Sequence, residues 1–533
     1  MECSCIRQTD LPHTSKLFAD LAYDFERVHD LYPWRPNSLD AVARASQFSF
    51  PDDRRAAIVR ALTPLNQGST PVDPRVEKSL QKLATPGVAA IVTGQQVGLF
   101  SGPAYTVYKA LTAIKIAAEL DARGIPAVPV FWLATEDHDL AEVDHAWVYG
   151  GDYRPVRLQA KGPADNGTHP VGGVVPENFP LAELREALAG LPFAEEAYAL
   201  VAGAYQPGQS MGSAFARTIR QLFAPYGLLM IDPMDTGVRA VAAPFMAEAV
   251  TRMPELVEAL IARNGELGTR GYHAQVLVDK QTSLAFLLEG GHRIALRHSN
   301  GEFVALHRKW RAAELSARAA ELSPNALLRP VMQDYLLPTA AYVGGPAELA
   351  YLAQSQVIYG KLLGRQPVAF PRAGFTILDE RAAKRMTRYG LNLTSLFTSD
   401  QTLQATMSAR LVPTELRERL NTTERAVAAA LDTLSADLGR FDVSLNGALS
   451  TSRRKIEYQI GKIGRKTASQ IMARDAQAAL DARSLSGLVF PEKHLQERLY
   501  SIVPFLAKFG PGLIGDIYAR VETGNPDHRL LVF

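Results

Sequence analysis

The 533-residue chain has few cysteines, little excess charge and no long hydrophobic run. Its two cysteines, Cys3 and Cys5, lie too close together for an easy bridge, so we expect no disulfide framework. Lysine and arginine number 57 against 55 acidic residues, and this balance excludes a general attraction to nucleic acid or anionic lipid. The longest apolar stretches, such as 284–288, are far shorter than the roughly 20 residues that span a bilayer.

These absences favour a cytoplasmic protein that contacts neither membrane nor nucleic acid, and the first residues carry no hydrophobic signal region. Cys3 and Cys5 could bind a metal, but frayed terminal residues explain them better. An apolar content of 47% supports a large core, and the chain length suggests roughly two to four domains.

Two apolar segments that end abruptly in polar residues carry most of the information in the chain. The first, at 91–103, reads IVTGQQVGLFSGP, and the second, at 128–139, reads VPVFWLATEDHD. Each is typical of a buried parallel strand whose carboxyl end opens into a crevice. A helical pattern from Pro103 to Gly124 connects them, so we predict parallel neighbours joined by a right-handed connection.

The predicted fold class is α/β, with a Rossmann-like parallel sheet core, inserted segments and a long antiparallel α-helical coiled coil. Further strands are expected at 226–235 and 367–378, and the segment 337–363 reads as a strand, a turn and a long helix. The proposed divisions are a helical layer at 1–87, the core at 88–380 with insertions at about 150–330, the coiled coil at 381–485, and a segment at 486–533 that returns to the core.

Local patterns predict the finer structure of the insertions and of the coiled coil. A meander of short strands at 273–307 would turn at Gly290–Gly291 and at Asn300–Gly301. Gly439 and Asp442 would end one long helix and begin the next. The final RLLVF would form a strand that rejoins the sheet. The residues at heptad spacing are Leu420, Val427, Leu431, Leu434, Leu438, Phe441 and Leu445.

The turn TGQQVGLFSGP is predicted to bind a ligand. Gly94 and Gly102 would let backbone amides approach an anion, and the helix after them would direct its positive end to the same place. Glycines that serve only packing in a tight turn are the alternative, since neither the Walker nor the dinucleotide pattern is present. Gln95 and Gln96 favour a ligand, because an amide can donate to and accept from a sugar hydroxyl. The candidate substrate-binding residues are Thr93, Gly94, Gln95, Gln96, Gly102, Lys109 and Gly345.

The segment TEDHDLAEVDH, at 135–145, holds the candidate catalytic residues Asp137, His138 and Asp139. His138 beside either aspartate would make a general base. The same cluster could instead bind a divalent metal through His138 and His145, or form a solvated acidic loop.

Three further features of the sequence each have a functional and a purely structural interpretation. Lys109, two turns into its helix, could reach an anion or lie on the surface. The turn Tyr342–Pro346, followed by Glu348, resembles a third strand end at the crevice, although a plain turn also explains it. The basic run at 453–466 could face nucleic acid or phosphate, but a solvated coiled-coil flank fits better.

Several of these segments closely resemble the BshC family, the cysteine-adding enzymes of bacillithiol synthesis. They are TGQQVGLFSGP, AYTVYKALTAIKIAAEL and PVFWLATEDHDLAEVDHAWV, supported by AYVGGPAELAYLAQ, PVAFPRAGFTILDE and the helical hairpin that follows. The resemblance covers essentially the whole chain, and its most specific part is TGQQ followed by EDHD at this distance.

The resemblance implies a ligase that joins the carboxyl of cysteine to the amine of glucosaminyl-malate and so forms bacillithiol. It also implies a homodimer through the coiled coil and an ATP or ADP site near the coiled coil, apart from the crevice. Arg372 and Lys384 are the candidates for binding the nucleotide, and no metal is expected. The residues carried over to the crevice are Gln95, Gln96, Asp137, His138 and Asp139.

Amide formation from a free carboxylate is uphill in water, so ATP would activate the carboxyl group. The chain has no HxGH segment, so it lacks the usual catalytic residues of class I synthetases. We expect His138 to act as general base, oriented by Asp137 or Asp139, and the glycine-rich turn to hold the malate carboxylates. The alternatives are a metal-dependent hydrolase or transferase that uses the EDHD cluster, and a non-catalytic coiled-coil protein that binds a nucleotide or sugar phosphate.

Overall fold

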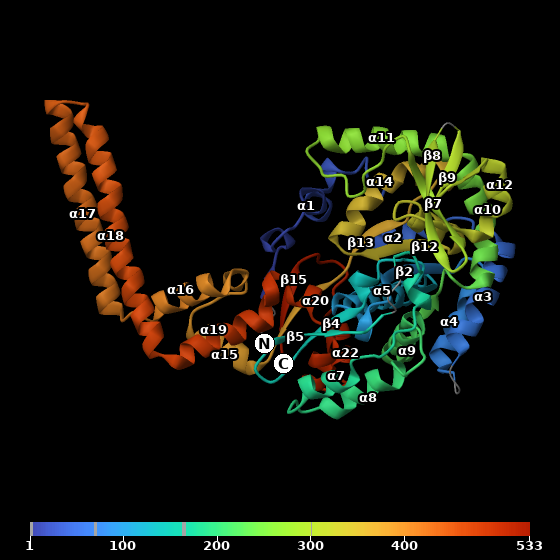
Figure 1. Ribbon diagram of the computed structural model, residues 1–533, viewed down its shortest axis with the longest axis horizontal. Coiled ribbons are helices and arrows are strands. Elements are labelled where there is room, and N and C mark those ends of the chain that lie inside the picture. Colours follow the sequence, from blue (N-terminus) through green and yellow to red (C-terminus); the bar gives the residue numbers. More distant parts are fainter. Residues whose placement is uncertain (1–3, 69–71, 163–166, 300) are drawn as a thin grey trace.

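The computed structural model describes residues 4–68, 72–162, 167–299 and 301–533. Its core is a parallel five-stranded sheet, in the order β13-β12-β2-β3-β6 (Figure 1). The strands are β2 (Ala89–Gln96), β3 (Ala127–Ala134), β6 (Leu229–Ile231), β12 (Thr339–Gly344) and β13 (Val368–Pro371).

The strand order reverses between β2 and β12. From β2 the chain adds β3 and β6 on one side, and later adds β12 and β13 on the other. Ligands in open α/β sheets bind at the carboxyl ends of the strands, next to such a switch point. We therefore expect a ligand to bind at the residues after β2, β3 and β12.

Helices cover both faces of this sheet, which explains why its strands are largely apolar. Ala89 and Ile91 of β2 pack in one apolar cluster with α5 (Tyr105–Ala122). The alternate residues Ala90 and Val92 pack in another cluster with α14 (Pro346–Leu362). Alternate side chains of a strand point to opposite faces, so burial on both faces removes any polar alternation.

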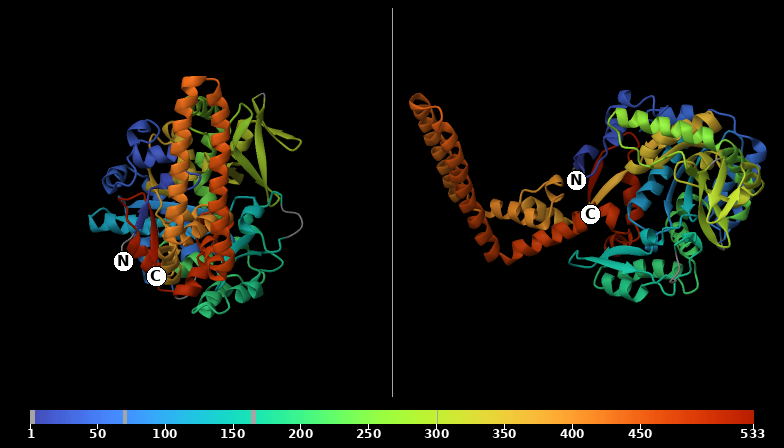
Figure 2. Two further views of the ribbon diagram at one scale, coloured as in Figure 1. Left: turned by 90° about the vertical axis from the view of Figure 1, so that its left-hand side faces the viewer. Right: turned by 45° about the horizontal axis from the view of Figure 1, so that its top comes forward.

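The insertion between β3 and β12 contains a second, antiparallel sheet in the order β10-β9-β8-β7-β11 (Figure 2). The predicted meander is confirmed, and Gly290–Gly291 join its first two strands with positive φ at both residues. The other predicted turn includes Asn300, which lies outside the described residues. The strands are β7 (Thr282–Glu289), β8 (His292–Ser299), β9 (Glu302–Ala305), β10 (Arg308–Trp310) and β11 (Leu322–Pro324).

The single strand expected at 367–378 is two strands in two sheets. β13 ends at Pro371, and after two residues β14 (Gly374–Leu378) pairs with β15 (His528–Val532) and, through it, with β1 (Ser4–Ile6). Proline lacks the N–H that would continue a ladder, and the chain leaves the core sheet there. The terminal RLLVF therefore joins the small sheet of β14 rather than the core sheet, which corrects the expectation.

Two long helices, α17 (Thr414–Phe441) and α18 (Leu445–Arg474), form an arm that projects from the body (Figures 1 and 2). The helical hairpin was predicted, but α17 continues through Gly439 and ends at Phe441. No residue of α17 is buried, and Leu434 and Phe441 are 44% and 86% exposed. Among the described residues, no helix combines the length and the apolar character that crossing a membrane requires.

Candidate active site

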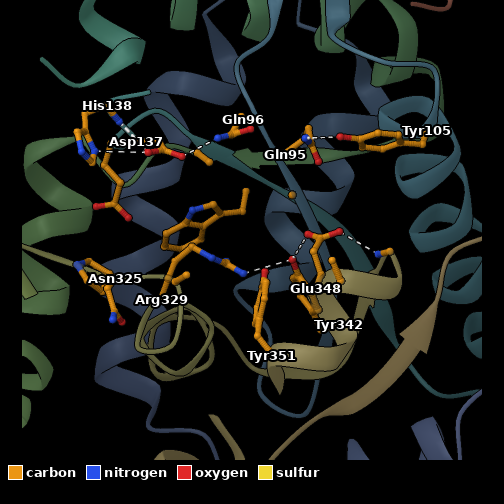
Figure 3. Close-up of a pocket in the computed structure, with 18 of the residues that line it drawn as sticks. Gln95, Gln96, Tyr105, Asp137, His138, Asn325, Arg329, Tyr342, Glu348 and Tyr351 are labelled. Carbon is orange, nitrogen blue, oxygen red and sulfur yellow. Dashed lines mark hydrogen bonds and ion pairs between the residues drawn. The ribbon is translucent and has the colours of Figure 1, made fainter. Parts of the chain in front are cut away.

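A cavity of about 510 Å³ lies at the switch point (Figure 3). Gly94, Gln95 and Gln96 line it from β2, Asp137 and His138 line it after β3, and Gly345 and Glu348 line it after β12. The structure thus brings together side chains from the three strand ends singled out in the sequence. The roles assigned to them remain predictions.

Gln96 and Asp137 join the first two strand ends directly. Gln96 Nε2 donates to Asp137 Oδ2 at 2.7 Å and to Glu142 Oε2 at 2.7 Å. The backbone N–H of His138 donates to Asp137 Oδ1 at 2.8 Å. Both oxygens of Asp137 are therefore engaged within the protein, which orients the loop after β3.

Arg293, which the sequence analysis missed, is the closest cationic partner of His138. Its Nη1 donates to His138 Nδ1 at 3.1 Å, its Nε to Ser323 Oγ at 3.1 Å, and its Nη2 to Pro324 O at 2.8 Å. The guanidinium also lies over the ring of Phe286. A guanidinium only donates, so Nδ1 must accept and neutral His138 carries its proton on Nε2.

Glu136 is the other missed residue of this wall. It lines the cavity with 4% of its surface exposed, and Ser323 Oγ donates to its Oε2 at 2.8 Å. Burial raises the pKa of Glu136 above its usual value, although the charges of Arg293, Arg239 and Arg329 oppose the rise. A carboxyl group whose pKa is raised in this way accepts a proton more readily than an ordinary glutamate.

Lys109 does not line the cavity. It is fully buried, and its ammonium donates to Gly94 O at 2.5 Å and to Gln95 Oε1 at 2.9 Å, and pairs with Glu348 Oε2 at 2.6 Å. The three protons of the ammonium are thereby used. Lys109 thus ties β2, α5 and α14 together. Removing one partner of such a buried ion pair costs about 3–5 kcal/mol of folding stability.

Glu348, the ion-pair partner of Lys109, lies at the amino end of α14. Tyr342 Oη donates to its Oε1 at 2.8 Å and the Gly345 N–H donates to its Oε2 at 2.9 Å. Burial alone would raise the pKa of Glu348, but the charge of Lys109 and these hydrogen bonds hold it below its usual value. The carboxylate therefore stays ionised and fully engaged.

Besides Lys109, four predicted site residues do not line the cavity. Thr93 is buried and donates to Val343 O, so it ties β2 to β12. Gly102 lies in a buried turn with φ +66° and does not line the cavity. Asp139 is exposed and does not line the cavity. Lys384 is 78% exposed and pairs with Glu380 one turn away on its own helix.

Arg372 lines the switch-point cavity instead of a nucleotide site near the arm. Its Nη1 donates to Glu497 Oε2 at 2.8 Å and its Nη2 donates to Glu497 Oε1 at 2.5 Å. This bidentate ion pair is buried between β13 and the C-terminal segment. Arg329 and Arg498 line the same cavity. Within the described residues, the side chain of Arg498 forms no hydrogen bond or ion pair.

A separate cavity of about 600 Å³ lies where the body meets the helices that carry the arm. Asp379 pairs there with Lys508 at 2.6 Å and accepts from Tyr153 Oη at 2.5 Å. Arginines line this cavity from three parts of the chain, and among them the side chains of Arg154, Arg381 and Arg483 form no hydrogen bond or ion pair within the described residues.

Among the described residues, no three histidine, cysteine, aspartate or glutamate side chains are grouped so that they could hold a metal ion. His138 Nδ1 faces Arg293, and His145 Nδ1 lies 3.0 Å from Asp144 Oδ1. The two histidines weighed as metal ligands thus each contact another protein group.

The fold and the cavity define a Rossmann-like α/β protein with its candidate site at the switch point of the sheet. Residues 1–373 match the family model described as "Bacillithiol biosynthesis BshC, N-terminal Rossmann-like domain", and residues 375–533 match its "C-terminal coiled-coil domain". The chain belongs to the BshC family.

Full-length relatives agree with this assignment. A Solibacter usitatus protein is 50% identical over 533 residues, covering all of both chains, and a Koribacter versatilis protein is 34% identical over 531 residues, covering 99% of each. A Salinibacter ruber protein is 30% identical over 535 residues, covering 97% of this chain and 96% of its own. Each is named "Putative cysteine ligase BshC".

Proposed function

We propose that this chain is a cytoplasmic ligase that joins the carboxyl group of cysteine to the amine of glucosaminyl-malate, the reaction that forms bacillithiol. The single observation that carries the proposal is the switch-point cavity, which combines amide, cationic and carboxylate groups from three strand ends. The family model is described by bacillithiol biosynthesis and the relatives are named putative cysteine ligases, which supports cysteine as a substrate and bacillithiol as the product.

The lining of the cavity suits an acidic amino sugar. Arg498, whose side chain has no hydrogen bond or ion pair in the part of the chain that the structure describes, and Arg329 can neutralise the carboxylates of the malate group. Gln95 and Gln96 can donate to and accept from sugar hydroxyls. The arginines, rather than the buried glycine-rich turn, thus take the role first assigned to that turn.

ATP is proposed to activate the cysteine carboxyl group, because direct condensation of a carboxylate with an amine is unfavourable in water. The cavity near the arm is the proposed nucleotide site, since Arg154, Arg381, Arg483 and Lys508 line it and phosphate groups bind arginine strongly. This assignment replaces Arg372 and Lys384, which do not share a cavity.

The arm is proposed to form a homodimer with the arm of a second copy. α17 and α18 leave large apolar side chains exposed, among them Leu434 and Ile463. A second arm would remove these side chains from water, as in other coiled coils.

The experiment is incubation of the purified protein with cysteine, glucosaminyl-malate and ATP, followed by mass spectrometry. We expect bacillithiol to form in proportion to enzyme concentration, and to be missing when ATP is omitted. Lack of product with all three substrates would refute the ligase. Product at an undiminished rate without ATP would refute only the activation step.

A further inference from the structure

The group that accepts a proton from the attacking amine is not obvious, because His138 is poorly placed for this role. Its Nδ1 already accepts from Arg293, so its proton lies on Nε2. Only Nη1 of Arg293 is directed at His138 Nδ1, because Nε and Nη2 donate to Ser323 and Pro324, and Asp137 Oδ1 lies 3.6 Å from Nδ1, beyond hydrogen-bond range. His138 in this arrangement offers a hydrogen-bond donor to the cavity, not a base.

Three carboxylates line the cavity, and two of them are fully engaged. Asp137 accepts from Gln96 on one oxygen and from the His138 backbone on the other. Glu348 is held by Lys109, Tyr342 and the Gly345 N–H. Each oxygen of these two groups therefore already accepts at least one hydrogen bond or ion pair.

Glu136 is different, because only one of its oxygens is engaged. Ser323 donates to Oε2, and within the described residues no hydrogen bond or ion pair reaches Oε1. The side chain is more than nine-tenths buried and belongs to the cavity wall. Oε1 is not among the fully buried atoms that lack a partner, so it is open to the cavity, where a ligand can donate a hydrogen bond to it.

We propose that Glu136 is the base that deprotonates the substrate amine, and that Arg293 is a positioning residue that keeps His138 as a donor beside it. This inference rests on the proposed ligase function and adds a residue to its site. Arg293 serves both partners, since its Nη1 faces His138 and its Nε donates to the same Ser323 that orients Glu136.

The ammonium group of the amino sugar gives one proton to Glu136 Oε1, and the nitrogen lone pair attacks the carbonyl carbon of an activated cysteine, an acyl phosphate or acyl adenylate. A C–N bond forms, the C–O bond to the phosphoryl oxygen breaks, and phosphate or AMP leaves with that electron pair. The second amine proton passes to the leaving phosphate or AMP as the amide forms, and Glu136 returns its own proton to solvent.

The charges around Glu136 fit this task. Arg293 of β8, Arg239 of α10 (Thr236–Thr251) and Arg329 of α13 (Arg329–Leu336) favour the ionised form, while burial favours the neutral form. Asp137 and His138 follow it in the chain. Because burial outweighs the three arginine charges, the pKa of Glu136 lies above that of an ordinary glutamate. A base is most effective when its pKa approaches the working pH.

The main experiment compares wild type with Glu136→Gln, which keeps the shape and the bond from Ser323 but cannot accept a proton. We expect kcat to fall at least ~100-fold while the affinity for glucosaminyl-malate, measured by calorimetry, changes by no more than about threefold. The wild-type rate should decline as acid protonates the base, and the variant should lose that decline.

A second variant keeps the test decisive if the amide disturbs the fold. Glu136→Gly opens space for an external carboxylate, so added formate should restore activity to Glu136→Gly but not to Glu136→Gln, whose side chain fills the space. Near-wild-type kcat in Glu136→Gln, or a lack of formate rescue with wild-type affinity retained, would overturn the assignment of the base.

The role of Arg293 has a readout separate from rate. ¹⁵N NMR of His138 should show an unprotonated Nδ1 in wild type, and this preference should be lost in Arg293→Met but largely kept in Arg293→Lys. A proton on Nδ1 in wild type would overturn the positioning role. If wild type made no bacillithiol, the proposed function would fail instead, whereas product from an unimpaired Glu136→Gln would remove only this inference.

Discussion

Arg293 Nη1 donates to His138 Nδ1 across 3.1 Å, although the two residues lie 155 positions apart in the chain. His138 follows β3 of the core sheet, while Arg293 belongs to β8 of the inserted antiparallel sheet. The insertion therefore contributes a residue, Arg293, to the candidate site. The same guanidinium favours the tautomer of His138 that carries its proton on Nε2, so we expect this histidine to act as a hydrogen-bond donor rather than as the base.

His138 as a donor predicts a graded response to substitution. His138→Gln keeps an N–H near the position of Nε2, whereas His138→Ala removes it, so we expect the alanine variant to lose ~10–100-fold in kcat and the glutamine variant clearly less. Steady-state kinetics at saturating substrates measures both. Equal losses in the two variants, with elimination of the acid limb of the pH profile, would restore His138 as the base.

Stability should depend on pH through His528, which is fully buried in the small sheet next to Thr376. Burial lowers its pKa from 6.5 to about 4, with the nearby Arg372 acting in the same direction and Glu497 opposing it. Between these values the unfolded chain binds a proton that the folded chain does not, so stability falls as pH drops from 6.5 to about 4. The full loss from this group is about 3 kcal/mol.

Urea unfolding of wild type and His528→Gln at several pH values isolates this contribution. The difference in unfolding free energy between the two proteins should shift in favour of the variant as the solution is acidified across that range. A difference that stays constant from pH 7 to pH 4 would show that His528 does not titrate as its burial predicts.

The cavity near the arm predicts where the nucleotide binds. Arg381→Ala or Arg483→Ala should weaken ADP binding ~10–100-fold, because each removes a charged hydrogen-bond donor to phosphate. Lys384→Ala is the matched control on the same helix as Arg381, and it should bind ADP as wild type does, since Lys384 is exposed and outside the cavity. Isothermal calorimetry gives all three affinities, and the reverse pattern would move the nucleotide elsewhere.

The exposed apolar residues of the arm predict its behaviour in solution. An aspartate in place of Leu434 or Ile463 would place a charge in the proposed interface and should shift the protein toward monomer. Asn421→Asp, at an exposed polar site of α17, should leave the oligomer unchanged. Sedimentation equilibrium distinguishes these outcomes, and a wild type that is monomeric at all concentrations would remove the proposed dimer.

The sequence predicted the parts of the site that follow from one rule of sheet geometry. Carboxyl ends of neighbouring parallel strands share an edge, so Gln96 and His138 could be placed together from their positions after two apolar runs. The helical hairpin was equally accessible, because its apolar residues repeat at heptad spacing.

The missed features depend on contacts that no local pattern encodes. Arg293 reaches the cavity only because the inserted sheet docks on the core, and nothing in its immediate sequence signals that docking. Lys109 was placed on the correct helix, but its pairing with Glu348 required knowing how α5 and α14 meet. The break after Pro371 was visible as a proline, yet only the partner strand β15 shows where the chain goes next.

A crystal structure with glucosaminyl-malate bound tests the central claim most directly. We predict the ligand in the switch-point cavity, with its amine nitrogen within about 3.2 Å of Glu136 Oε1 and its malate carboxylates beside Arg498 and Arg329. A ligand held in another cavity, or an amine directed away from the ends of β2, β3 and β12, would contradict it.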